Sequence, residues 1–85
     1  MNPTSARLDE SPVKIRFSTD ASGNQVIYEG YPDGNAPTSE AKWAIKRTVV
    51  LADGSGVDTQ MWASGNRNKT QVFDNRESLT YKPIY

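Results

Sequence analysis

The tetrapeptide Asp53-Gly54-Ser55-Gly56 constrains the fold most, because it is a strong hairpin signal between two runs with strand-like alternation. Residues 43–51 and 57–63 are these runs. In the first run, one face carries Trp43, Ile45, Val49 and Leu51, with Arg47 interrupting the series. A period of two indicates a half-buried strand. We therefore predict an antiparallel pair joined by this glycine-rich turn.

A helix is the alternative for the start of the first run. Thr38 and Ser39 could cap a helix, and Glu40-Ala41-Lys42 favours helix formation. The alternation that follows over residues 43–51 favours a strand instead.

An earlier hairpin is predicted upstream. Val13, Ile15 and Phe17 alternate with polar side chains, which is typical of a half-buried strand. Residues 20–24 supply turn-forming side chains, and residues 25–31 form a second alternating run. A polar loop over residues 32–39 then separates this hairpin from the next one.

The C-terminal part predicts shorter strands. Residues 64–70 form a polar loop, and residues 74–76 can form a turn before a last alternating run at residues 79–81. Pro83 places the tail at a sheet edge or beyond the sheet. The total of five to six short strands predicts a mainly β protein, a small antiparallel β-sandwich or barrel.

We expect one β domain over residues 12–85 and an extended N-terminal arm over residues 1–11. The arm is expected to contact neighbouring chains or to fold back on its own domain. Aliphatic residues are sparse, but two Trp and four Tyr add apolar area. The formal net charge is zero, which argues against disorder. No apolar run approaches the length of a membrane span.

Enzyme chemistry has little support in this sequence. The chain has no Cys and no His, which excludes thiolate catalysis and the Ser-His triad. Asp53 and Asp58 flank the glycine-rich turn, where Asp is favoured for local hydrogen bonding, and they lack the register of a calcium loop. We therefore expect no catalytic residues, no cofactor and no metal site.

Aromatic and arginine side chains are the candidate interaction residues, because these types dominate interface hot spots. Trp43 lies on an alternation that faces inward, whereas Trp62 lies opposite Met61. One Trp is therefore a candidate to face a partner, and burial of both in a two-sided sheet is the alternative. Arg76 lies in the closing turn, where a half-buried guanidinium would need a carboxylate or carbonyl. A solvated Arg76 is the alternative.

An ordered set of short motifs resembles a group of small tailed-bacteriophage virion proteins. The set comprises Tyr28-Glu29-Gly30-Tyr31, Ala36-Pro37-Thr38-Ser39, Trp43-Ala44-Ile45-Lys46-Arg47, Met61-Trp62-Ala63-Ser64-Gly65 and Phe73-Asp74-Asn75-Arg76-Glu77-Ser78-Leu79-Thr80-Tyr81. It covers about residues 26–81, and Phe73 stands where the family pattern usually has a second Trp.

The resemblance implies a non-enzymatic structural component of a virion, either a capsid-decorating (cement) subunit or a neck or tail accessory. It implies other virion proteins as partners in a multi-copy assembly. It also implies a location in the virion, and in the host cytoplasm during assembly. The expected interface or structural residues are Trp43, Trp62, Phe73, Arg76 and Tyr81.

Two other functions stay open. A small single-stranded nucleic-acid-binding β-barrel could stack bases on Tyr28, Tyr31, Trp43 and Trp62, although the balanced charge argues against steering toward phosphate. A carbohydrate-binding module could use Trp62 as the platform for a sugar ring.

Overall fold

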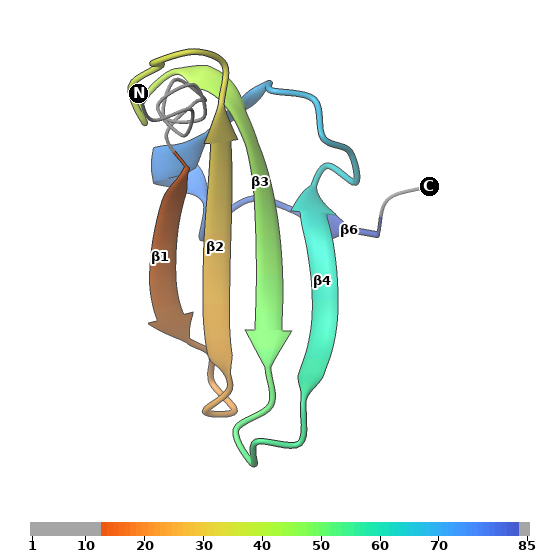
Figure 1. The fold of residues 1–85 in the computed structure, drawn as a ribbon. Helices are drawn as coiled ribbons and strands as arrows, with labels where there is room; N and C mark the ends of the chain where they lie inside the picture. Colours follow the sequence, from red (N-terminus) through yellow and green to blue (C-terminus); the bar gives the residue numbers. More distant parts are fainter. Residues whose placement is uncertain (1–12, 84–85) are drawn as a thin grey trace, which may run out of the picture.

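A computed structural model describes residues 13–83 as one antiparallel β-sheet with a single short helix (Figure 1). The predicted N-terminal arm lies outside the described residues. The elements are β1 (Lys14–Thr19), β2 (Gln25–Pro32), β3 (Ala41–Val50), β4 (Val57–Ala63), β5 (Gln71–Val72), the 3₁₀ helix η1 (Phe73–Asn75) and β6 (Tyr81–Lys82). The predicted mainly β, antiparallel fold is confirmed, and within residues 13–83 its six strands form one sheet in which β1 and β6 do not pair, in place of a two-sheet sandwich or a closed barrel. Within this range no helix is long and apolar enough to cross a membrane.

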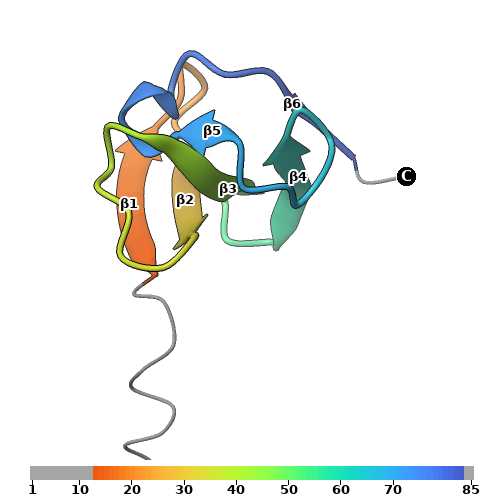
Figure 2. The ribbon, with the colours of Figure 1, turned by 90° about the horizontal axis from the view of Figure 1, so that it is seen from above.

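The strand order is β1-β2-β3-β4-β6, and every neighbouring pair is antiparallel. Strand β3 is the centre of the sheet because it pairs with β2 along one side and shares its other side between two strands. Its residues Ala41 and Trp43 pair with β5, and residues 46–50 pair with β4. Viewed from above, β1 to β4 form a curved layer with η1 and the C-terminal segment on one side (Figure 2).

The prediction of a strand over residues 43–51 is confirmed apart from its last residue, because β3 begins at Ala41 and ends at Val50. The helix alternative fails because strand pairing with β2 and β5 takes the backbone of residues 41–43. The glycine-rich turn is also confirmed. Gly54 has a φ of 80°, and the Leu51 amide donates to the Gly56 carbonyl across the turn.

The hydrophobic core lies on one face of the sheet, which we call the core face. Strands β2 and β3 contribute alternate residues, and the segment from η1 to β6 covers them. The Trp43 and Phe73 rings lie with centroids 5.1 Å apart, and the Tyr28 and Tyr81 rings lie 6.0 Å apart. The buried members of this cluster are Val26, Tyr28, Trp43, Ile45, Val49, Ala63, Phe73 and Tyr81. Aromatic residues thus make up for the sparse aliphatic content.

Gly30 of β2 makes this cover possible. A Cβ atom added at Gly30 would lie 2.5 Å from Phe73 Cδ1 and 2.9 Å from Trp43 Cε3. Phe73 therefore packs directly against the β2 backbone at the one position that has no side chain.

The first predicted strand is present as β1, but the prediction that its apolar face is buried is wrong. Val13, Ile15 and Phe17 are 44%, 46% and 66% exposed. Ile15 and Phe17 pair with Glu29 and Ile27, which point away from the core face. The covering segment lies on the opposite side of the sheet, so the polar side chains of β1 face the core side instead.

Candidate interaction surface

The outer face of the sheet, opposite the core face, carries an aromatic pair that spans three strands. Tyr31 of β2 and Trp62 of β4 have ring centroids 5.7 Å apart with an interplanar angle of 31°. Strand β3 runs between them, and the residue that pairs with Tyr31 there is Ala44, which is only 2% exposed. The small side chain of Ala44 leaves room for the two rings to meet above it.

Charged groups surround this pair. Lys46 Nζ lies 3.2 Å from Glu29 Oε1, and the Tyr31 hydroxyl donates to Glu29 Oε2 at 3.4 Å. Lys46 Nζ and Arg67 Cζ each lie 6.0 Å from the centre of a Trp62 ring. Burial, followed by the Glu29 carboxylate, raises the pKa of Tyr31. The aromatic pair thus has two cations at Trp62 and one carboxylate at Tyr31.

The same face continues to the edge of the sheet, where β1 exposes apolar side chains. Cross-strand pairing aligns Phe17 with Ile27 and then with Thr48, and it aligns Ile15 with Glu29 and then with Lys46. The outer face therefore carries exposed apolar side chains at β1 and the aromatic pair of β2 and β4, with the Glu29–Lys46 ion pair between Ile15 and Trp62.

The structure separates the two predicted Trp residues. Trp43 is 1% exposed, and its Nε1 donates to the Pro37 carbonyl at 2.9 Å, so it belongs to the core. Trp62 is half-buried on the outer face. Of the two candidates, Trp62 is the one that can face a partner.

Phe73, Arg76 and Tyr81 meet on the core side, away from Trp62. The Arg76 guanidinium lies 4.9 Å from the Phe73 ring centre, and its Nη1 donates to the Phe73 carbonyl at 3.4 Å. The Tyr81 hydroxyl donates to the Arg76 carbonyl at 2.7 Å. The expectation that Arg76 reaches a carbonyl is confirmed, and these contacts give the three residues a structural role in the closing turn.

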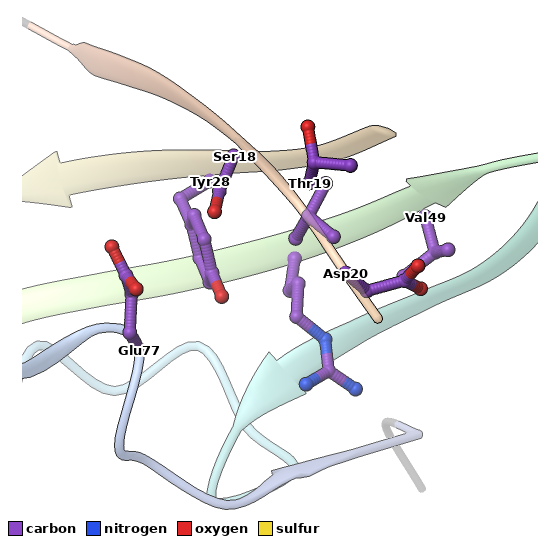
Figure 3. Close-up of a pocket in the computed structure, with 8 residues that line it drawn as sticks. Ser18, Thr19, Asp20, Tyr28, Val49 and Glu77 are labelled. Carbon is purple, nitrogen blue, oxygen red and sulfur yellow. The ribbon is translucent and has the colours of Figure 1, made fainter. Parts of the chain in front are cut away.

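A cavity of about 270 Å³ opens on the core side near the β1–β2 turn (Figure 3). Tyr28 and Glu77 lie toward one end of it, and Asp20 and Val49 lie toward the other. Arg47 also lines this cavity, with its guanidinium 4.6 Å from the Tyr81 ring centre. Its Nε is buried and makes no hydrogen bond within residues 13–83.

Of the two carboxylates that line the cavity, Asp20 is already engaged in local hydrogen bonds. The Asp20 carboxylate accepts hydrogen bonds from the amides of Ser22 and Asn24, each at 2.9 Å, so it closes the turn. We did not predict a cavity here, although an arginine interrupting an apolar alternation was a visible signal. Across residues 13–83, no cluster of three or more potential ligand side chains is placed to hold a metal ion.

The Tyr81 phenol gives a testable pH dependence. Burial, with a further contribution from Tyr28, raises the pKa of Tyr81 above its ordinary value of 10.0. A raised folded-state pKa stabilises the fold below pH 10, and this stability is lost as pH rises toward the folded pKa. We expect the free energy of unfolding to fall above about pH 10, by at most about 1.4 kcal/mol per pH unit from this group.

Urea unfolding at pH 8 to 11 (roughly the range around the unperturbed tyrosine pKa) would measure this slope. Tyr81→Phe removes the hydrogen bond from the Tyr81 hydroxyl to the Arg76 carbonyl, so its free energy of unfolding should be about 1 kcal/mol lower at neutral pH. The free energy of unfolding of this variant should also fall less steeply at high pH. The smaller remaining fall would come from Tyr28 and Tyr31, whose pKa values burial also raises. An equal pH dependence in both proteins would contradict the prediction.

The five predicted interface or structural residues therefore divide by face. Trp43, Phe73, Arg76 and Tyr81 lie on the core side, and Trp62 lies on the outer face. Comparison of the sequence and fold with protein-family models, curated proteins and solved structures gives no match.

Proposed function

We propose that this protein is a non-enzymatic structural component of a tailed-phage virion, a capsid-decorating subunit or a neck or tail accessory. It binds neighbouring virion proteins through Trp62 on the outer face and through its N-terminal arm. The observation that carries the binding role is the outer face itself, which combines exposed apolar side chains at β1 with an aromatic pair flanked by cations.

The composition of this face suits a protein partner. Aromatic and arginine side chains are enriched at interface hot spots, and large exposed apolar patches mark interaction surfaces. Phe17 alone is 66% exposed, which is costly for a chain that meets only water. Trp62, half-buried against Tyr31, is held in a fixed position and can insert without losing much side-chain freedom.

The virion setting comes from the sequence resemblance. Its motifs include the strand of Trp43, the segment of Trp62 and the closing stretch from Phe73 to Tyr81. Trp43, Phe73 and Tyr81 belong to the buried core cluster. The motifs that carry the resemblance therefore also stabilise the sheet that presents the outer face. A module with a small core would gain stability from neighbours in a multi-copy assembly.

The test is incorporation into particles of a phage that encodes this chain. The wild-type protein should be present in purified particles, and Trp62→Ala or deletion of residues 2–11 should reduce its occupancy at least about tenfold, the equivalent of 1.4 kcal/mol. Thr70→Ala, at an exposed loop position, is the matched control and should incorporate normally. Absence of the wild-type protein from particles, or normal occupancy of both altered forms, would overturn the proposal.

Binding of single-stranded nucleic acid is the second candidate function. Tyr31 and Trp62, with Lys46 and Arg67 beside them, have the composition of a base-stacking platform. The Glu29 carboxylate pairs with Lys46 and places negative charge next to that platform, which disfavours phosphate. Gel shift at low salt, where such binding is strongest, decides between the two. A shift lost in Trp62→Ala would support this function, and no shift would remove it.

A further inference from the structure

Exposed large apolar side chains are concentrated at the two edges of the sheet. Among residues 13–83 they are Val13, Ile15 and Phe17 at β1 and Val57, which is 53% exposed, at β4. Phe17 pairs with Ile27 on the outer face, and Val57 pairs with Val50 on that same face. Both edges therefore present apolar groups on one side of the sheet.

Both edges also have backbone groups without a strand partner in the described part of the chain. Among the described strands, β1 pairs only with β2. Within residues 13–83, strand β4 pairs with β6 only at Trp62 and Ala63, so the edge of residues 57–61 that faces away from β3 has no strand partner there. Unpaired edges of this kind are templates for the addition of another strand.

The directions of the two edge strands match for joining one copy to the next. Each step from β1 to β2, to β3 and to β4 is antiparallel, so β1 and β4 run in opposite directions. Consider a second copy in the same orientation, placed next to β4 with its outer face on the same side of the sheet. Its β1 would then lie beside β4 of the first copy and would run antiparallel to it. The sheet then continues from one chain into the next with regular pairing.

We propose that β1 of one copy adds to the free part of β4 in the next copy, so that the chains associate head to tail through a continuous sheet. Phe17 and Ile15 of one chain would then lie beside Val57 of its neighbour on the outer face, where each would lose contact with water. This partner, a second copy, goes beyond the binding of other virion proteins.

Charge favours this pairing over a symmetric one. Strand β1 carries Lys14 and Arg16, and β4 carries the exposed Asp58. Two β1 strands facing each other would bring the basic side chains together, and like charges across strands are destabilising. A head-to-tail contact uses two different surfaces, so it permits assemblies larger than a dimer.

Sedimentation velocity of the purified full-length chain from micromolar to millimolar concentration tests the proposal. The average mass of the wild-type protein should rise with concentration beyond two chains. Phe17→Glu blocks one edge and Val57→Glu blocks the other, so each variant alone should stay at the monomer mass. Both substitutions are at exposed positions, and circular dichroism verifies that each variant is folded.

An equimolar mixture of the two variants is the decisive sample. The Val57→Glu chain keeps an intact β1 edge, and the Phe17→Glu chain keeps an intact β4 edge. One chain of each kind should therefore form a dimer, and no larger assembly should form because both remaining edges are blocked. Thr70→Glu, which adds the same charge in an exposed loop, should associate like the wild type. A monomeric wild type, self-association of Val57→Glu alone, or a mixture that stays monomeric would overturn the proposal.

The two proposals can fail separately. A chain that is monomeric at every concentration can still be incorporated into particles by other proteins. A chain that assembles head to tail can equally be absent from particles.

Discussion

Replacing Phe73 with alanine is expected to lower the free energy of unfolding by about 4 kcal/mol. Phe73 is 1% exposed and stacks against Trp43, and it is the only residue of η1 that is buried. Its ring packs against Trp43 and Gly30 and so anchors the segment from β5 to β6 on the core face. Truncation would leave a cavity and would also loosen that segment, so the loss should be large relative to the stability of a small domain.

Urea unfolding followed by tryptophan fluorescence measures this loss, because Trp43 contacts the Phe73 ring directly. Val57→Ala is the matched control, since it also removes apolar atoms, but at a position that is 53% exposed. The control should change the free energy of unfolding by no more than about 0.5 kcal/mol. A loss below about 1 kcal/mol for Phe73→Ala would show that the C-terminal segment is not fastened by this ring.

Replacing Gly30 with alanine is expected to cost about 3 kcal/mol, at the upper end of what overpacking a core costs. The added methyl group would lie within 2.5–2.6 Å of two Phe73 ring carbons and 2.9 Å from Trp43. Both rings are buried, so neither can move aside without disturbing the whole core cluster. The same urea titration measures the change.

A double-mutant cycle separates this clash from a general effect on the strand. In the Phe73→Ala background, the Gly30→Ala substitution should cost at most about 1 kcal/mol, because the closest ring is gone. The difference, about 2 kcal/mol, is the coupling between the two positions. Equal costs in the two backgrounds would mean that Phe73 does not pack on the Gly30 backbone.

The strands themselves could be predicted from local pattern. Residues 25–31 and 57–63 alternate, and a glycine-rich turn precedes the second run, so β2 and β4 follow from period and turn chemistry. After β5 a turn was predicted over residues 74–76, and the structure has the 3₁₀ helix η1 at residues 73–75. That turn depends on long-range contacts, such as the Asp74 amide donating to the Thr38 carbonyl.

The candidate surface was only partly visible in the sequence. Alternation placed Trp43 and Trp62 on opposite faces, and the structure agrees. It did not bring Tyr31 next to Trp62, because those residues lie on strands that do not pair with each other. Their contact requires the register of β3 between them and the small side chain of Ala44.

The sequence by itself determined which side chains share a face, because a period of two is a local property of the extended backbone. It determined the hairpin turns for the same local reason. Only the tertiary structure decided which face is covered, because the cover comes from residues 71–82, far along the chain from β1. Because the cover lies on the core face, Trp43 is buried, whereas Val13, Ile15 and Phe17 stay exposed at the β1 edge, the edge that the proposed association uses.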